Sequence, residues 1–250
     1  MAKRVWGVSR IRDLKLCPAM YVCKYETKPK LWVEVPSPQM ERGSKVHKTL
    51  EDSIKYDLAL EKELASVEGF VGMLVKWKNE GTVVLPEMKF GLRSNFTRCE
   101  FFNDPDLRAR IGLDVYVKDD RKLMVIDWKT GRYKPEHRQD ARFYGAAAWI
   151  ATPGAESCTV IYPYIDDPAS TFEEVITKPE AIMTAAWGEF DRADDYLDSN
   201  GKSGVPRRID PPMNPGNHCG WCGNMECPSN KNEKAREYLK AQTINLKEMF

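Results

Sequence analysis

The chain has 250 residues, of which 42% are hydrophobic and 30% are charged, and its formal net charge is +1. This composition suits one globular domain with a sizeable core. The first residues, "MAKRVWGVSR", lack the apolar centre of a secretory signal, and the longest apolar run, "GAAAWIA", is far shorter than a membrane span. We therefore expect a soluble, cytoplasmic protein with no membrane partner.

The near-neutral net charge conceals a strong asymmetry along the chain. Residues 1–30 contain eight bases and two acids, a net charge of +6, whereas residues 156–200 contain eleven acids and two bases, a net charge of −9. This separation favours one face turned toward a polyanion and another turned away from it. The alternative is ordinary solvated surface.

The first half of the chain is predicted to begin with helices. Residues 9–25 have a helical pattern with Ser9 as a possible N-cap, and Pro38 falls in the loop that follows. A second helix starts at Gly43, where Ser44 can cap it and apolar residues recur with a helical period. The remaining elements of this half are a helix over 66–79 and strands over 83–92 and 96–103.

The second half mixes strands and helices. Residues 107–131 alternate between apolar and polar positions on both sides of "KDDRK", which predicts a β-hairpin. A helix follows over 135–151, and then come strands over 157–165 and 171–177 and an acidic helix over 179–198.

The hairpin brings acidic and basic side chains together. In "VIDWKTG", Asp127 and Lys129 are two positions apart on a strand and therefore share a face. If the hairpin loop is Asp120-Arg121, paired residues have numbers that sum to 241, and Asp114 lies opposite Asp127. Two carboxylates at this separation repel each other unless a cation lies between them, and their oxygens suit Mg²⁺ or Mn²⁺.

Such a site has a specific chemical use. A divalent cation beside a lysine polarises a phosphoryl oxygen, lowers the pKa of a bound water and stabilises developing negative charge. The alternative is an exposed cross-strand ion pair, which contributes under about 1 kcal/mol. The metal interpretation depends on the assumed register, because a shift of one residue would break the shared face.

The seven cysteines are an odd number for a disulfide framework, and some of them favour metal or cluster binding. Cys219, Cys222 and Cys227 follow a C-x2-C-x4-C pattern in a loop rich in proline and glycine. Three thiolates with His218 would form a zinc site, and four thiolates suit zinc or an iron–sulfur cluster. Two further cysteines, Cys99 and Cys158, lie in predicted strands and are expected to be core thiols.

Several motifs together resemble one family. Asp114 in "IGLD", followed by "DWKTG", resembles the G-x-x-D and D/E-x-K motifs of the PD-(D/E)XK nuclease superfamily. Its RecB-like branch has a histidine motif, a Q-x-x-x-Y helix and cysteine segments near both ends. These resemble "RGSKVHKTLE", "RQDARFYGAAAW", "SRIRDLKLCPAMYVCKYE" and "CGWCGNMEC". The motifs extend over residues 9–227, and the pattern is most similar to phage-encoded RecB-like exonucleases, the CRISPR-associated iron–sulfur exonuclease and the AddB nuclease domain.

The resemblance implies a fold and a domain organisation. The expected fold is an α/β, restriction-endonuclease-like mixed β-sheet flanked by helices, with a cysteine-bound cluster that ties the N- and C-terminal segments together. The expected organisation is a single nuclease domain over 1–250, in which 1–30 and 210–230 form the cluster subregion.

The resemblance also implies a hydrolytic site. Its catalytic residues would be Asp114, Asp127 and Lys129. The ligands of Mg²⁺ or Mn²⁺ would be His47, Asp114, Asp127 and the backbone carbonyl of Trp128. Glu51, four residues after His47 on the same helix, is a candidate to orient the imidazole, although a surface His47–Glu51 pair is the alternative. Glu87 is a further strand acid within possible reach.

For the cysteines, the resemblance implies a [4Fe–4S] cluster with a structural role, held by Cys17, Cys219, Cys222 and Cys227. Cys23 competes with Cys17 for the fourth position, and structural Zn²⁺ is the alternative metal.

The DNA-binding residues implied by the resemblance come from the hairpin exit and the helix over 135–151. They are Arg132, Arg138, Gln139, Arg142 and Tyr144. Asp140 stands where the family pattern has its glutamine, with Gln139 one residue earlier. The bases of residues 1–30 would add phosphate contacts, which makes binding salt-sensitive.

The function implied is that of a metal-dependent DNA exonuclease that hydrolyses phosphodiester bonds in phage or bacterial recombination, replication or repair. It would act in the host cytoplasm if it is phage-encoded. Its partners would be DNA with linear or single-stranded ends and, in addition, recombination or replication proteins. The alternatives are a trimming nuclease of the CRISPR-adaptation type and a DNA-binding recombination subunit with weak or no catalysis.

Overall fold

The computed structural model describes residues 4–27, 32–34, 36–200 and 212–239. The chain divides into two compact units, one formed by Met1–Gly7 with Pro38–Glu189 and the other by Val8–Ser37 with Phe190–Phe250. The second unit includes most of the two segments that were assigned to the cluster subregion. The single domain expected from the sequence stays a prediction.

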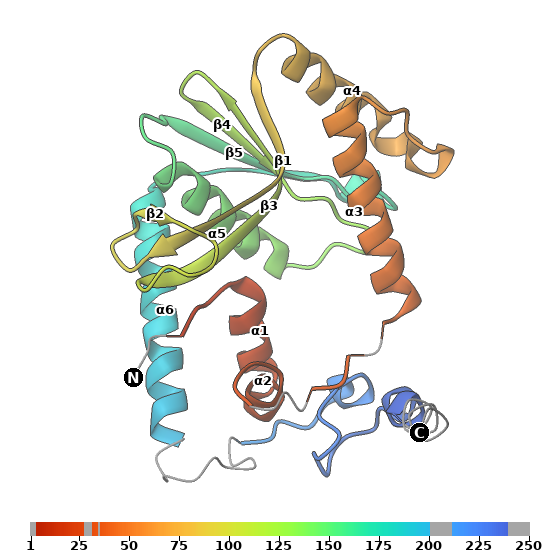
Figure 1. The fold of residues 1–250 in the computed structure, drawn as a ribbon, viewed down its shortest axis with the longest axis vertical. Helices are drawn as coiled ribbons and strands as arrows, with labels where there is room; N and C mark the ends of the chain where they lie inside the picture. The colour runs from red at the N-terminus through yellow and green to blue at the C-terminus, as the bar shows by residue number, and fades with distance from the viewer. Residues whose placement is uncertain (1–3, 28–31, 35, 201–211, 240–250) are drawn as a thin grey trace. The chain divides into compact units, whose positions relative to one another are not determined.

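The first unit is built on a six-stranded sheet with the strand order β2-β1-β3-β4-β5-β6 (Figure 1). The strands are β1 (Val83–Arg93), β2 (Arg98–Cys99), β3 (Leu107–Asp119), β4 (Lys122–Ile126), β5 (Ser157–Tyr162) and β6 (Phe172–Val175). All neighbours are antiparallel except β4 and β5, which are parallel. A parallel pair needs a crossover connection, and α5 (Glu136–Ile150) supplies it. The expected mixed sheet flanked by helices is confirmed.

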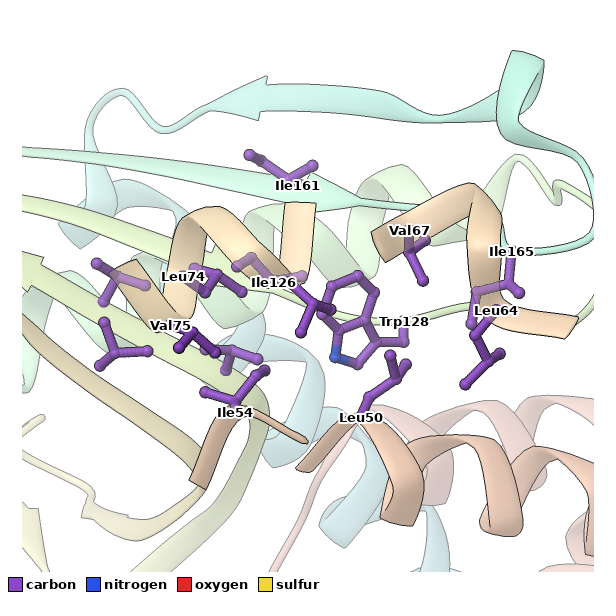
Figure 2. Close-up of a cluster of buried hydrophobic side chains, with 14 of the residues drawn as sticks. Leu50, Ile54, Leu64, Val67, Leu74, Val75, Ile126, Trp128, Ile161 and Ile165 are labelled. Carbon is purple, nitrogen blue, oxygen red and sulfur yellow. The ribbon is translucent and has the colours of Figure 1, made fainter. Parts of the chain in front are cut away.

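Helices cover both faces of this sheet. On one face, α3 (Pro38–Tyr56) and α4 (Ala65–Asn79), joined through the short 3₁₀ turn η1 (Lys62–Leu64), pack against each other and against β1. On the other face, α5 packs against β3, β4, β5 and β6. Figure 2 shows the core on the α3–α4 side, where Leu50 and Ile54 of α3 and Leu74 of α4 meet Ile126 and Trp128.

The predicted hairpin register is correct. Asp120 and Arg121 form the two-residue loop, and the ladder runs from Asp119↔Lys122 to Val115↔Ile126. Asp120 has a positive φ of 50°, which a two-residue hairpin turn demands and which aspartate tolerates better than most residues. The turn therefore fixes the face on which each later side chain lies.

Three predicted elements differ from the structure. The helix expected over 9–25 is two helices, α1 (Val8–Leu16) and α2 (Pro18–Tyr25), because Cys17 precedes a proline and is extended. Ser9 lies inside α1 and does not cap it. The second helix, α3, begins at Pro38, since proline is tolerated in a first turn, and Ser44 is internal to it. The strand expected over 96–103 is reduced to the two residues of β2.

The other predicted elements are found with shifts of a few residues at their ends. α6 (Pro179–Asn200) starts in the first unit and ends in the second. Two short 3₁₀ turns, η2 (Pro168–Ser170) and η3 (Asn217–Gly220), complete the named elements. None of the described helices combines the length and apolarity that a membrane span requires.

Candidate active site

The segment after β4 places acid and base on the same face. Beyond the end of β4, the backbone N–H groups of Asp127 and Lys129 donate to the carbonyls of Ile161 and Pro163, both at 3.0 Å. Asp127 and Lys129 therefore keep the strand alternation, while Trp128 between them enters the core and is 2% exposed (Figure 2). The shared face predicted from the sequence is confirmed.

Asp127 is a buried acid whose pKa is raised. Its carboxylate forms an ion pair with the Lys129 ammonium. Burial raises the pKa of Asp127 to about 6, and the negative charge of Asp114 adds to the increase, while Lys129 acts in the opposite direction. The neighbouring Asp114 accepts a hydrogen bond from the Trp128 backbone N–H through Oδ2, at 2.8 Å. The two aspartates thus share one electrostatic environment.

His47 reaches this environment from α3. Its Nδ1 lies 3.3 Å from Oδ2 of Asp114. Burial disfavours the imidazolium, but the hydrogen bond that His47 donates to Asp114 and the charges of Asp114 and Asp127 outweigh burial, so the pKa of His47 is raised. The structure therefore brings together His47, Asp114, Asp127 and Lys129, as the sequence predicted.

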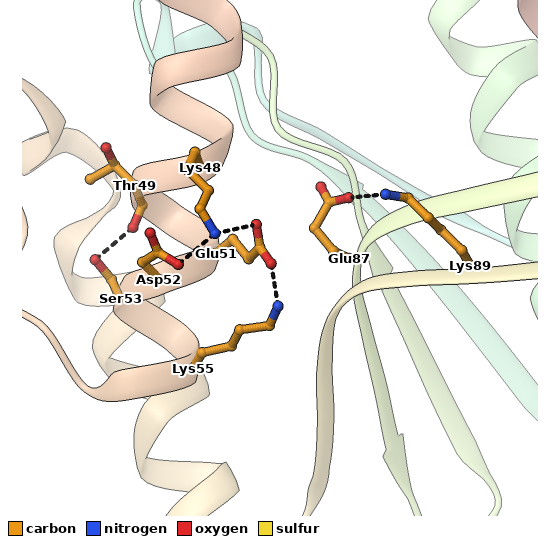
Figure 3. A network of polar contacts seen from close by, with 8 residues as sticks. All are labelled: Lys48, Thr49, Glu51, Asp52, Ser53, Lys55, Glu87 and Lys89. Atoms are coloured by element: carbon orange, nitrogen blue, oxygen red, sulfur yellow. Dashed lines mark hydrogen bonds and ion pairs between the residues drawn. The ribbon is translucent and has the colours of Figure 1, made fainter.

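Glu87 joins them from β1 through an unusual backbone conformation. The β1–β3 ladder pairs Pro86 with Val115 and Met88 with Leu113, but Glu87 and Asp114 between them are not paired. Glu87 has a positive φ of 54°, which is uncommon for a residue with a side chain and is often found at functional sites. Figure 3 shows its carboxylate with Lys89, whose Nζ lies 3.0 Å away.

One histidine and two acids form a compact donor set. Ligand atoms of His47, Glu87 and Asp114 all lie within 4.8 Å of one another. An imidazole nitrogen with two carboxylate oxygens suits a hard or borderline divalent cation such as Mg²⁺ or Mn²⁺, so the residues fit the metal that the sequence predicted. From the sequence, Asp127 was expected in the metal shell and Glu87 was an outer candidate. The described geometry sets Glu87 in the compact group and pairs Asp127 with Lys129. Asp127 as a metal ligand stays a prediction.

Glu51 does not orient His47, contrary to the expectation. In Figure 3, the two oxygens of Glu51 face Lys48 and Lys55 of the same helix. Lys48 also bonds Asp52 at 2.8 Å. The spacing of four residues allows a His47–Glu51 contact, but the same spacing allows the contact with Lys55, and two lysines attract the carboxylate more strongly than a partly buried imidazole.

A buried tyrosine beside the site, Tyr162 of β5, was not predicted as a site residue from the sequence. β5 runs parallel to β4 and its continuation, with Ile126 paired to Ile161 and Lys129 bridged to Tyr164. In this register Tyr162 stands beside Asp127 on the same face. Tyr162 is fully buried, its hydroxyl has no hydrogen-bond partner among the described residues, and burial together with the nearby carboxylates raises its pKa. The alternating tyrosines of "IYPYI" were the available signal, but only the β4–β5 register gives them a position.

The predicted DNA-binding residues, four in α5 and Arg132 before it, lie in different environments. Arg138 and Arg142 both pair with Glu174 of β6, at 3.1 Å and 2.6 Å, and Gln139 beside them is exposed. Tyr144 is half-buried, and its ring makes an edge contact with Phe143. Asp140, at the position of the family glutamine, is buried at 8% exposure. The remaining residue, Arg132, is exposed and lines a surface hollow with Tyr133 and Asp166.

The five cysteines of the predicted cluster region all belong to the second unit. Cys17 and Cys222 share a small buried cluster with Met20. Burial and the charges of Cys222, Glu226 and Cys227 raise the pKa of Cys23 to about 12. Burial also raises the pKa of Cys222, and Cys227, Cys17 and Cys219 add to this increase. All seven cysteines are free thiols, so disulfides do not organise this region.

Buried side-chain amides hold the backbone of the cysteine loop in place. Buried Asn230 donates to the carbonyls of Cys222 and Asn224 at 2.9 Å and 2.8 Å, and Asn232 donates to the Cys222 carbonyl at 3.2 Å. His218 lies with Nε2 at 4.0 Å from the sulfur of Cys219. Within the described part of the chain, no three of the sulfurs lie within 4.8 Å of one another, so the choice among Cys17, Cys23 and His218 stays open.

The comparisons with known proteins decide the family. The sequence matches the family model of the PD-(D/E)XK nuclease superfamily over residues 5–227. The chain belongs to the PD-(D/E)XK nuclease superfamily. The mixed sheet flanked by helices is consistent with the restriction-endonuclease-like fold of this superfamily. The assignment to its RecB-like iron–sulfur branch stays a prediction.

Two solved structures are among those similar to this nuclease-superfamily chain. The protein titled SSO0001 is 16% identical, with 88% of this chain and 85% of that chain covered and a TM-score of 0.44. The alkaline exonuclease LHK-Exo from Laribacter hongkongensis is 13% identical, with 73% of this chain and 91% of that chain covered and a TM-score of 0.27. No curated protein matches the chain.

Proposed function

We propose that this member of the superfamily is a metal-dependent DNA exonuclease. One observation carries the proposal: the donor atoms of His47, Glu87 and Asp114 lie within 4.8 Å of one another, beside the Asp127–Lys129 ion pair. Acidic and imidazole donors that can hold a cation next to a lysine suit hydrolysis of a phosphodiester, because negative charge develops on the phosphoryl oxygens.

Each residue has a defined part in this proposal. His47, Glu87 and Asp114 would hold Mg²⁺ or Mn²⁺, with Asp127 and the Trp128 carbonyl contributing from the adjacent segment. When bound, the cation supplies positive charge that polarises the phosphoryl group and eases deprotonation of water. Lys129 would direct its ammonium at the phosphoryl oxygens, where it stabilises the charge of the transition state. Asp127 would keep that ammonium in place through their ion pair.

The substrate we propose is DNA with linear or single-stranded ends, such as arises in recombination, replication or repair. The decisive experiment is a time course with end-labelled linear DNA and a covalently closed circle of the same sequence, with Mg²⁺, with Mn²⁺ and with chelator. We expect loss of the linear DNA only with metal, and survival of the circle. Cleavage of both at similar rates would indicate an endonuclease.

The test variant is Asp114→Asn, which removes a donor charge. Its matched control is Asp52→Asn, which removes a carboxylate of the α3 surface network (Figure 3). The first should be inactive and the second should be as active as the unaltered chain. No metal-dependent cleavage of any DNA by the unaltered chain would contradict the proposal and favour a binding subunit.

We also propose that the cysteines of the second unit hold a [4Fe–4S] cluster, with structural zinc as the alternative. The support is that Cys17, Cys23, Cys219, Cys222 and Cys227 all belong to one unit. Neighbouring cysteines add to the effect of burial in raising the pKa of Cys23 and of Cys222. Protein purified without oxygen should be brown and contain iron. Cys222→Ala should bleach it, whereas Cys158→Ala, a change in a buried thiol of β5, should not. A colourless protein with one equivalent of zinc would exclude the cluster.

Comparing Cys17→Ala with Cys23→Ala identifies the fourth ligand, because only the substitution that removes a cluster ligand should bleach the protein. If neither change does so and His218→Ala removes the metal, the set is three cysteines and one histidine.

A further inference from the structure

The ring of Tyr162 lies directly beneath the lysine of the candidate site. The Lys129 Nζ is 4.9 Å from the centroid of the Tyr162 ring. The parallel register that pairs Ile126 with Ile161 puts Tyr162 next to Asp127, on the face that carries Lys129. The ring is therefore positioned by backbone pairing, and its contact with the lysine does not depend on a flexible loop.

The Tyr162 ring also contacts other aromatic side chains. Tyr162 pairs with Phe172 across β5 and β6, and their rings stack with centroids 5.1 Å apart and planes at 23°. The His137 ring of α5 lies 6.1 Å away on the same aromatic cluster. Because Tyr162 is fully buried, the ring has little freedom to move away from the lysine.

We propose that Tyr162 is the positioning residue of Lys129. The inference rests on the proposed nuclease function and adds a residue that acts through the lysine. An ammonium attracted only by Asp127 can approach that carboxylate from many directions. A ring face beneath it limits those directions by cation–π attraction. Since a ring accepts no proton and occupies no strong hydrogen-bond donor, the N–H groups of the lysine stay available to phosphoryl oxygens.

The proposal separates the ring from the hydroxyl, and two variants test that separation. Tyr162→Phe keeps the ring, whereas Tyr162→Leu removes it. In the metal-free protein, the ε-methylene protons of Lys129 should be shifted upfield by the ring current, and Lys129→Ala identifies their signal. We expect the shift in the unaltered chain and in the phenylalanine variant, and its loss in the leucine variant. This readout needs neither metal nor activity.

The kinetic expectation follows the same division. Tyr162→Leu should lower kcat by about tenfold or more with KM unchanged, since a misplaced ammonium weakens only the transition state. Tyr162→Phe should stay within about threefold of the unaltered chain. The matched control is Phe90→Leu, which removes another buried ring that lies 5.3 Å from a cation, Arg98, in the same sheet. That change should leave kcat unaffected.

Several results would overturn the positioning role. They are an unshifted Lys129 signal in the unaltered chain, full kcat in the leucine variant, and an equal loss of kcat in both variants, which would assign the effect to the hydroxyl. An inactive unaltered chain with a shifted Lys129 signal would contradict the nuclease proposal and leave the ring contact established, so the two failures are distinguishable.

Discussion

The carboxylate site of the first unit and the cysteine loop of the second unit place their functional groups by different means. In the first unit, strands do the positioning: a two-residue turn sets the register, and alternation then directs Asp127 and Lys129 to one face. In the second unit, a 3₁₀ turn and buried amides do so, with Asn230 bonded to two loop carbonyls. Regular pairing places side chains that a sequence pattern can predict, whereas loop packing depends on individual contacts.

The two regions also differ in the ions that they suit. The strand site offers carboxylate oxygens and an imidazole, which favour hard or borderline cations, and the loop offers thiols, which favour zinc or iron–sulfur clusters. Changes in the strand site should therefore chiefly affect the rate of hydrolysis. Changes in the cysteine loop should chiefly affect stability.

The largest effect is expected at Lys129. Lys129→Ala removes the ammonium that we assign to the transition state, and we expect kcat to fall by about 10²–10³-fold or more. DNA affinity, measured by fluorescence anisotropy with Ca²⁺ in place of Mg²⁺, should change little, because most of the binding energy comes from phosphate contacts elsewhere. A variant that keeps more than about a tenth of the rate would remove Lys129 from the mechanism.

In the second unit, the corresponding sensitive position is Gly223. A Cβ there would lie 2.2 Å from the Val33 carbonyl oxygen and 2.7 Å from the Trp32 ring, so Gly223→Ala must displace the backbone of the loop. We expect a loss of unfolding free energy on the order of 3 kcal/mol, measured by urea unfolding.

The control is Gly220→Ala in the same loop, where a Cβ meets nothing within 4 Å. This change should cost well under about 1 kcal/mol. Equal stability of both variants would show that the loop is not packed as described.

The difference between the regions explains what the sequence could predict. The face shared by Asp127 and Lys129 follows from a period of two, and the opposition of Asp114 follows from the position of one turn. The position of Glu87 follows from neither. It needs the β1–β3 register and a left-handed conformation that no residue pattern announces, since glutamate is not a residue typical of positive φ.

Two other differences have separate causes: a proline interrupts a helical pattern, and the pairing of two strands distant in sequence places a tyrosine. Pro18 makes Cys17 extended and divides one predicted helix into two. Tyr162 was assigned to a strand correctly, but its place beside Asp127 depends on the crossover that α5 makes between β4 and β5. Asn230 and Asn232 carry no motif at all, and their importance is visible only from their burial and hydrogen bonds.

A third prediction concerns the pH dependence of the first unit. Burial raises the folded-state pKa of Asp127 from 3.8 to about 6, so between these values the folded protein binds a proton that the unfolded chain releases. The contribution of Asp127 to stability in the absence of metal therefore increases as the pH falls from above 6 toward 4. Asp127→Asn mimics the neutral acid and should stabilise the metal-free protein at pH 8 by on the order of 3 kcal/mol.

The measurement is urea unfolding with chelator at several pH values between about 4 and 8. The stability difference between the variant and the unaltered chain should disappear near pH 4, where both carry a neutral group at 127. His47 also has a raised pKa, and its contact with Asp114 contributes stability that is lost as the pH rises through that value in both proteins. Parallel stability curves for the two proteins would show that Asp127 is not buried as an unfavourable charge.

The smallest effect is expected at Glu174, where the structure bears on the predicted DNA surface. Arg138 and Arg142 share the Glu174 carboxylate, which is 13% exposed, and the Arg138 guanidinium also lies 4.7 Å from the Phe172 ring. A carboxylate that bridges two guanidinium groups competes with a phosphate for the same donors. Glu174→Gln keeps the shape and removes the competing charge.

If the two arginines contact DNA, Glu174→Gln should increase affinity by about two- to fivefold at low salt and steepen the dependence of log K on log salt by up to about one phosphate contact. The control is Glu156→Gln, which breaks an exposed ion pair with Arg121 at the other end of β4 and should change neither quantity. Unchanged affinity in the Glu174 variant, together with unchanged affinity in Arg142→Ala, would remove α5 from the DNA surface. The bases of residues 1–30 would then remain as the predicted phosphate contacts. Most of these bases belong to the second unit, which would then bind DNA in addition to the structural role of its cysteine loop.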